Sequence, residues 1–292
     1  MSKKWTGDSG LQIRMAASFI ILGILYSVFL GGMHYLGVNS FQLTIIASFM
    51  VLIQWYFSDN IVLWTSGAKI VSEQEYPRLH EIVAKLASNN NLPKPKVAIV
   101  NSQVPNAFAT GKSPKNSLIA VTLGILNLLD DDELEAVIGH ELTHVKSRDV
   151  LVLTLASIFS IVAWYLIQFG FFSGLRGRNR DTAGTIAIVL LVAVITWVVS
   201  FIMIRAISRY REYCADRGGA IMTGKPDRLA DALLKISGRM KKIPPKDLEN
   251  VQKLNAFFII PALSGTSIAN LFSTHPPVEK RVLKLKSMIN QT

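Results

Sequence analysis

Four long apolar runs without a charged side chain constrain this chain more than any other feature of its sequence. They are residues 15–33, 41–57, 150–172 and 183–204, and they contain 19, 17, 23 and 22 residues. At about 1.5 Å of rise per residue, helices of these lengths approach or exceed the roughly 30 Å of hydrocarbon in a bilayer. Half of the 292 residues are hydrophobic, and the mean hydropathy is +0.35, which is too apolar for an ordinary soluble protein. The sequence therefore predicts a mainly α-helical membrane protein with about four hydrophobic helices.

Some of these runs have alternative interpretations. Basic residues precede the first run, as in a secretory signal peptide, but its length and the second run close behind it favour a retained anchor. The runs at 150–172 and 183–204 are also compatible with buried core helices. They also fit a hairpin that enters the bilayer only partly, because the loop 173–182 between them carries three arginines. The sequence leaves open whether these two runs span the membrane.

The segment HELTH at residues 140–144 indicates the chemistry. Side chains four residues apart lie on one face of a helix, so His140 and His144 can bind one Zn²⁺ ion. Glu141 projects beside them as a candidate general base. A pair of histidines on the surface of an ordinary helix is the alternative.

Local signals place this segment on a helix. Asp130 is a good N-cap residue, and Glu133 stands three positions later, which is the spacing of a capping box. Apolar residues recur after it at helical spacing. We therefore expect a helix from Asp131 to about Ser147.

A hydrolytic zinc site needs a third protein ligand and an open position for water. The metzincin pattern is excluded, because Ser147 and Val150 stand where that class has Gly and His. The best candidates for the third ligand are Glu212 and Asp216, four residues apart on a predicted helix after the fourth apolar run. One carboxylate can bind the metal while the other holds a ligating histidine. Alternatively, Glu212 pairs with a neighbouring arginine on a solvated face.

The distribution of positive charge predicts the orientation in the membrane. Lys and Arg number nine in 58–149 and sixteen in 205–292, which together is 25 of the 31, whereas the loop 34–40 has none. The positive-inside rule puts both basic segments in the cytoplasm. The net charge of +11 fits contact with anionic lipid, and no motif for nucleic acid is present.

The rest of the cytoplasmic part is predicted to be α+β with a small sheet. We expect a helix at 75–89 and strands at 96–102 and 117–126. Residues 104–111 combine turn residues with an apolar edge. Such an edge beside a zinc helix could bind an extended peptide as an added strand, and a plain hairpin without substrate contact is the alternative.

Four motifs in order carry a resemblance to a known family. HELTH, EYCADRGGA at 212–220, NAFATG at 106–111 and STHPPVEKR at 273–281 resemble the HtpX heat-shock membrane proteases, which are related to the CAAX prenyl endopeptidases. The resemblance covers nearly the whole chain. It implies one Zn²⁺ per chain in a gluzincin-type endopeptidase of the bacterial inner membrane, with misfolded or damaged membrane proteins as substrates. The oligomeric state is not implied.

The resemblance also implies roles for individual residues. The zinc ligands would be His140, His144 and Glu212, and the catalytic base would be Glu141. It places Asn106, Ala107 and Phe108 at the substrate, and His275 near the scissile bond. Asp216 would hold a ligating histidine in place without binding the metal itself. The resemblance assigns no role to Arg281, which could pair with a carboxylate near the metal or with lipid phosphate, so its role is open.

The predicted organisation has four parts. Residues 1–57 form an N-terminal pair of membrane helices, and 58–149 form the first part of the protease domain. Residues 150–204 form the second hydrophobic pair, and 205–292 complete the protease domain. Two other functions stay open, namely a CAAX-type prenyl-protein processing enzyme and a non-catalytic sensor or scaffold that holds zinc.

Overall fold

The computed structural model describes residues 9–35, 40–174, 180–243 and 275–289. The turns expected at 34–40 and 173–182 lie partly outside these residues. By contacts within the chain, the molecule divides into two compact units. One is built mainly of Phe57–Val150 and Ser208–Thr292, and the other of Ser9–Tyr56 and Leu151–Ile207.

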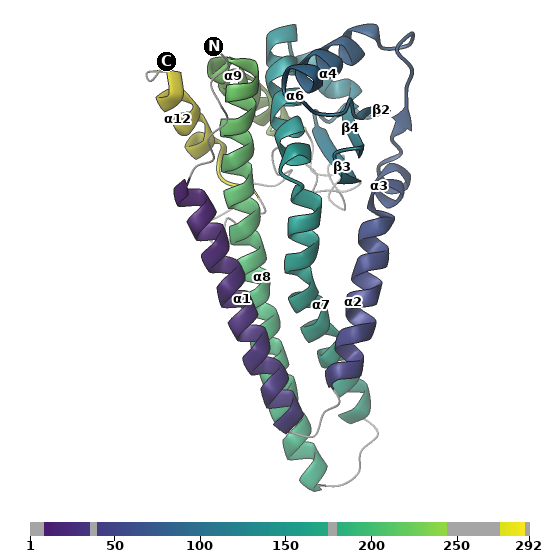
Figure 1. Cartoon of the computed structure of the whole chain (residues 1–292), viewed down its shortest axis with the longest axis vertical. Helices are drawn as coiled ribbons and strands as arrows, with labels where there is room; N and C mark the ends of the chain where they lie inside the picture. The colour runs from purple at the N-terminus through teal and green to yellow at the C-terminus, as the bar shows by residue number, and fades with distance from the viewer. Residues whose placement is uncertain (1–8, 36–39, 175–179, 244–274, 290–292) are drawn as a thin grey trace. The chain divides into compact units, whose positions relative to one another are not determined.

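The second of these units consists of apolar helices. Each of the four apolar runs lies in one helix, and Figure 1 labels these helices α1, α2, α7 and α8. They are α1 (Ser9–Tyr35), α2 (Ser40–Tyr56), α7 (Asp149–Gly174) and α8 (Arg180–Thr223). Leu22 of α1 packs with Ala156 of α7 and Ile207 of α8, and the Tyr26 hydroxyl lies 3.0 Å from Thr44 Oγ1 of α2.

The apolar helices expose large hydrophobic side chains. Val28 is 69% exposed and Leu191 is 61% exposed. Among the described residues, the stretches Ile13–Gly31 and Ala187–Thr223 are long and apolar enough to cross a membrane, and only 17% and 22% of their most apolar windows are buried. Such low burial argues against core helices of a soluble protein. Crossing by α2 and α7 stays a prediction.

The other unit contains a four-stranded mixed sheet in the order β1-β2-β4-β3. β2 runs parallel to β4, whereas β1 and β3 pair antiparallel with their neighbours. The sheet therefore has β3 as an edge strand. The strands are β1 (Lys69–Ile70), β2 (Lys96–Val100), β3 (Ala107–Ser113) and β4 (Asn116–Thr122).

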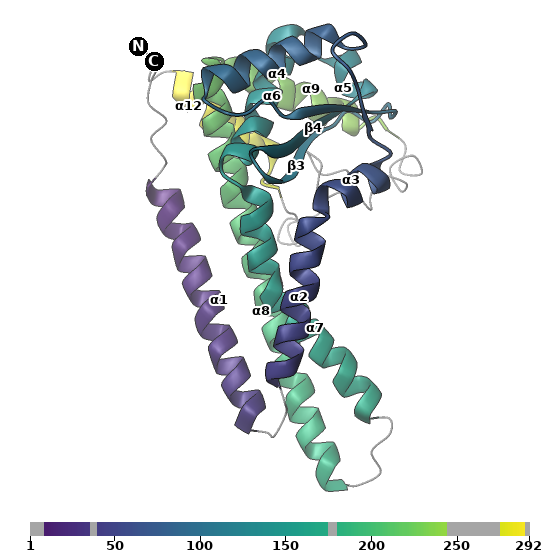
Figure 2. The same ribbon diagram turned by 45° about the vertical axis from the view of Figure 1, so that its right-hand side comes forward.

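Alternating side chains bury the two faces of this sheet. Ala107 and Ile119 enter the main core, whereas Phe108 and Ala120 pack against Val62 of α3 on the opposite face. Figure 2 shows α4 and α6 on one side of β3 and β4, and α3 on the other. Within its described residues, this unit contains α3 (Ser58–Ser66), α4 (Pro77–Asn89), α5 (Leu123–Leu128), α6 (Asp131–Lys146), α9 (Pro226–Met240) and α12 (Val278–Ile289), together with the C-terminal part of α8.

The sequence prediction of a strand over 117–126 was wrong at its end. The strand stops at Thr122, because the Thr122 side chain accepts a hydrogen bond from the Ile125 N–H and begins α5. The predictions for 75–89 and 96–102 are confirmed as α4 and β2, each shortened by two residues at one end. The edge expected at 104–111 is β3.

Candidate metal centre

Helix α6 presents the HELTH segment as predicted. The Asp130 carboxylate accepts the Glu133 N–H at 2.9 Å, and the Asp130 N–H donates to the Glu133 carboxylate at 3.0 Å, which completes a capping box. The helix runs from Asp131 to Lys146. His140 is 1% exposed and the His144 side chain is 18% exposed, so the histidines do not lie on a solvated face.

Helix α8 crosses α6 at close range through glycines. A Cβ on Gly219 would lie 2.7 Å from the backbone nitrogen of His140, and one on Gly139 would lie 2.7 Å from Thr223. Residues 212, 216 and 219 are spaced four and three apart, so they share one face of α8. The glycine contact therefore brings Glu212 and Asp216 against the histidines of α6.

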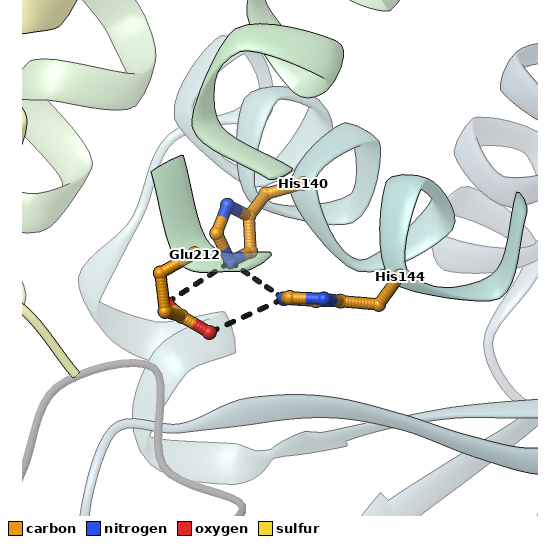
Figure 3. Close-up of side chains that lie close together, drawn as sticks. All are labelled: His140, His144 and Glu212. Atoms are coloured by element: carbon orange, nitrogen blue, oxygen red, sulfur yellow. Dashed lines mark hydrogen bonds and ion pairs between the residues drawn. The ribbon is translucent and has the colours of Figure 1, made fainter. Parts of the chain in front are cut away.

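The side chains of three candidate ligands converge where the two helices cross. His140 Nε2 lies 3.1 Å from His144 Nε2 and 3.7 Å from Glu212 Oε2. His144 Nε2 lies 3.4 Å from Glu212 Oε1. Figure 3 shows the two imidazole rings and the carboxylate turned toward one another. Within the described part of the chain, these three residues form a group of His, Cys, Asp or Glu side chains that could hold a metal ion.

These distances fit a tetrahedral zinc site. Bonds of about 2.0–2.1 Å imply roughly 3.3–3.4 Å between neighbouring ligand atoms, and the observed separations of 3.1, 3.4 and 3.7 Å bracket this value. Both Nδ1 atoms face carboxylates, Asp216 for His140 and Asp149 for His144. A neutral imidazole protonated on Nδ1 leaves its Nε2 lone pair free. His140, His144 and Glu212 therefore offer two nitrogen ligands and one carboxylate oxygen, which suits a cation such as zinc.

Arg281 of α12 joins the two acidic residues of α8. It donates to both carboxylate oxygens of Asp216, at 2.8 and 2.7 Å, and its Nη1 lies 3.2 Å from Glu212 Oε2. The side chain is fully buried. Of the two partners expected for Arg281, the carboxylate near the metal is the observed one.

His275 also reaches the cluster, just before α12. Its Nδ1 lies 3.0 Å from Glu212 Oε2, and the residue is buried. A residue 63 positions after Glu212 in the sequence thus contacts the same carboxylate as Arg281.

The surrounding charges keep the acidic pair ionised. Burial alone would raise the pKa of Glu212, but the charges of His275 and Arg281 outweigh it and hold the pKa well below its usual value. Burial would also raise the pKa of Asp216, and here Arg281 and His140 outweigh it and lower the pKa. Both groups are therefore anionic at neutral pH.

Glu141 behaves differently from the other carboxylates. Burial raises its pKa to about 7, and the charge of Glu212 adds to this. The backbone of Ala109 in β3 donates a hydrogen bond to it. This side chain can therefore exchange a proton near neutral pH, beside the metal-binding atoms and against the edge strand.

The side chains expected at the substrate are buried. Ala107 and Phe108 are 1% and 5% exposed and pack into the two opposite faces of the sheet. The Asn106 N–H donates to Thr122 Oγ1 at 2.9 Å. The strand reaches the site through its main chain at Ala109 instead.

Sequence reasoning did not identify two features of this site. One is Asp149, whose Oδ2 lies 2.6 Å from His144 Nδ1 and which pairs with Arg211. The other is the pair Gly218 and Gly219, where adjacent glycines inside a helix were a signal of close backbone packing.

Comparison with known proteins shows the family of this chain. Residues 73–289 match peptidase family M48. The chain is 51% identical to Protease HtpX homolog 2 of Methanosarcina acetivorans, over 99% of this chain and 98% of that protein. It is 50% identical to a protease HtpX homolog of Moorella thermoacetica, over 99% and 97%.

A solved structure shares the fold. The match to the crystal structure of S. mikatae Ste24p covers 95% of this chain and 67% of the Ste24p chain, with a TM-score of 0.59 and 16% sequence identity. The two histidines and the glutamate therefore lie in a chain that belongs to peptidase family M48.

Proposed function

We propose that this chain is a zinc-dependent endopeptidase of the membrane that cleaves misfolded or damaged membrane proteins on the cytoplasmic side. The observation that carries the proposal is the convergence of His140, His144 and Glu212 within 4.8 Å, next to a buried carboxylate that can exchange a proton. Family membership and the exposed apolar helices support the membrane protease class.

In this proposal His140, His144 and Glu212 hold one zinc ion. Bound zinc supplies a water of lowered pKa and polarises the scissile carbonyl. Arg281 keeps Glu212 anionic and Asp216 directed at His140. The protein thus presents three ligands and leaves the remaining position for water and substrate.

Glu141 acts as the general base and then as the general acid. It accepts a proton from the attacking water and delivers it to the leaving amine. Burial raises the pKa of the Glu141 carboxyl, and this makes it a stronger base toward the attacking water. The hydrogen bond from the Ala109 backbone fixes the direction of the carboxylate.

His275 stabilises the oxyanion that develops on the substrate carbonyl. Its place beside Glu212, 3.0 Å from Oε2, supports this role because the ring is held close to the metal ligands. A donor aimed at developing negative charge is typically worth about 10²–10³ in kcat.

The substrate lies along β3 as an added strand. β3 is one of the two edge strands of the sheet, and its residue Ala109 contacts Glu141. Asn106, Ala107 and Phe108 lie at the start of this edge, and their side chains are buried. The Asn106 main chain pairs with Thr122, so Ala107, the next residue, would direct its main-chain groups toward the added strand. Binding through the main chain suits damaged proteins, because it makes little demand on sequence.

The basic segments 58–149 and 205–292 support a cytoplasmic position for the protease domain. Relatives come from archaea and bacteria, so the membrane is the plasma membrane, which is the inner membrane in a bacterium with two. To test this, cysteines are placed at Lys115 and in the loop 34–40 of a Cys214→Ser chain in intact cells. An impermeant reagent should label only the loop, and labelling at Lys115 would contradict the orientation.

The protease proposal is tested with Glu141→Gln in the full chain in detergent. We expect it to keep one zinc per chain, measured by atomic absorption, and to lose cleavage of casein and of an unfolded membrane protein. The control is Glu135→Gln on the same helix. Glu135 pairs with Lys85 and Lys225, which are not part of the metal centre, so this variant should keep both zinc and cleavage. Loss of zinc in Glu141→Gln would make Glu141 a ligand, and cleavage that survives both this change and a chelator would refute the proposal.

A further inference from the structure

The second ligand histidine has a carboxylate partner of its own. His144 Nδ1 lies 2.6 Å from Asp149 Oδ2. An ionised carboxylate only accepts hydrogen bonds, so His144 Nδ1 carries the proton and donates it. This leaves Nε2 of the neutral ring with its lone pair, and Nε2 is the atom that faces His140 and Glu212.

The backbone between the two residues is bent to make this contact. Asp149 follows His144 by five positions, which in a continuous helix would point it to a different side. Helix α6 ends at Lys146, and Arg148 adopts a left-handed conformation with φ of 53°. A residue other than glycine in this region is unfavourable by about 1–2 kcal/mol. This turn places Asp149, the first residue of α7, under the imidazole of His144.

Arg211 fixes Asp149 from the side of α8. Its guanidinium pairs with Asp149 Oδ1 and its Nη2 donates to the carbonyl of Ser147 at 3.1 Å. Arg211 and Asp149 are both buried. One side chain thus holds both the carboxylate and the turn that carries it.

The arrangement repeats what surrounds His140. There the ring contacts Asp216 at 3.1 Å through Nδ1, and Arg281 holds Asp216. Each ligand histidine therefore has its own carboxylate, and each carboxylate its own arginine. The two sets of histidine, carboxylate and arginine come from different segments of the sequence. Only the contact between His140 and Asp216 could be predicted from the spacing of residues on α8.

We propose that Asp149, held by Arg211, is a positioning residue that fixes the ring and tautomer of His144 for metal binding. This rests on the proposed zinc site and extends it. Loss of a carboxylate behind a ligating histidine typically weakens metal affinity 10- to 100-fold. The start of α7 is therefore part of the support of the metal centre.

The test measures zinc dissociation constants by competition with a chelator, using the full chain in detergent with Glu141→Gln as the parent to prevent self-cleavage. Asp149→Ala should weaken zinc binding 10- to 100-fold and shift the visible absorption bands of the Co²⁺-loaded protein. Asp149→Asn keeps the shape and a neutral acceptor, and it should fall between Ala and the parent. The matched control is Asp227→Ala, which removes an exposed carboxylate from the first turn of α9 and should leave both measurements unchanged.

The outcomes separate this inference from the proposed function. If the parent binds one zinc but Asp149→Ala binds it within twofold with the same Co²⁺ spectrum, the positioning role is wrong and the protease proposal stands. An equal loss in Asp227→Ala would also overturn the inference, because a general effect of a helix N-terminal charge would explain it. If the parent itself binds no zinc, both fall. Asp149→Asn keeps the test decisive should Asp149→Ala fail to fold.

Discussion

The crossing of α6 and α8 at Gly219 leaves no space for a side chain, and Gly219→Ala should therefore damage the metal centre. A Cβ at this position would lie 2.7 Å from the nitrogen and 2.9 Å from the Cα of His140. Ordinary contacts begin at about 3.4–3.5 Å, so the two backbones must separate by roughly 0.7 Å. No flexible side chain can absorb this movement, because these two nearest atoms belong to the backbone of a ligand residue.

The displacement is large for a metal site. Ligand distances tolerate changes of about 0.2 Å, and α8 carries Glu212 while α6 carries both histidines. Overpacking of this kind costs about 1–3 kcal/mol. Without metal the helices can move apart to relieve the clash, whereas bound zinc requires them together. The cost therefore falls on zinc binding and corresponds to a roughly 5- to 150-fold weaker affinity.

The assay is chelator competition in detergent, combined with the zinc-dependent rise in Tm. Gly238→Ala is the control, because Gly238 lies within α9 and a Cβ there has nothing within 4 Å. The control should bind zinc as the wild type does. The reasoning is refuted if Gly219→Ala keeps wild-type affinity, or if Gly238→Ala loses as much.

Three further outcomes are expected. A Cβ in Gly218→Ala would lie 2.4 and 2.6 Å from the Thr143 side chain, so adding Thr143→Ala should restore part of the lost Tm. A double-mutant cycle should give a coupling energy of at least about 0.5 kcal/mol, and additive losses would argue against the contact. In equilibrium dialysis, Glu212→Ala should abolish zinc binding while Asp216→Ala weakens it 10- to 100-fold, and the reverse order would exchange their roles. The purified chain should cut itself when zinc is added, seen as fragments on a gel, and a chelator or Glu141→Gln should prevent it; fragments that still form with the chelator would indicate another protease.

The parts of the site that local sequence determines were predictable. Helix α6 begins where the capping box of Asp130 and Glu133 indicated, and the four-residue spacing of His140 and His144 fixes their shared face. The same spacing selected Glu212 and Asp216 on α8. In each case the relevant geometry is that of a single helix, which the sequence expresses directly.

The remaining parts depend on contacts between segments. Asp149 has the sequence context of a helix start, and its contact with His144 arises only because Arg148 turns the backbone. The role of Arg281 was left open between two partners because it depends on where α12 packs. The apolar run at 117–126 fits a strand or a helix equally well, and the cap by Thr122 decides between them.

The origin of the site from separate segments also determines when in synthesis it is completed. Glu212 follows His144 by 68 residues, and Arg281 follows Glu212 by another 69. At about 5–20 residues per second, the last buried charge is synthesised roughly 7–27 s after the histidines. A nascent chain therefore carries HELTH before Glu212, the third ligand, and Arg281, which pairs with Glu212, have been synthesised. The protein is inactive during the interval in which its own unfolded segments are the nearest available substrates.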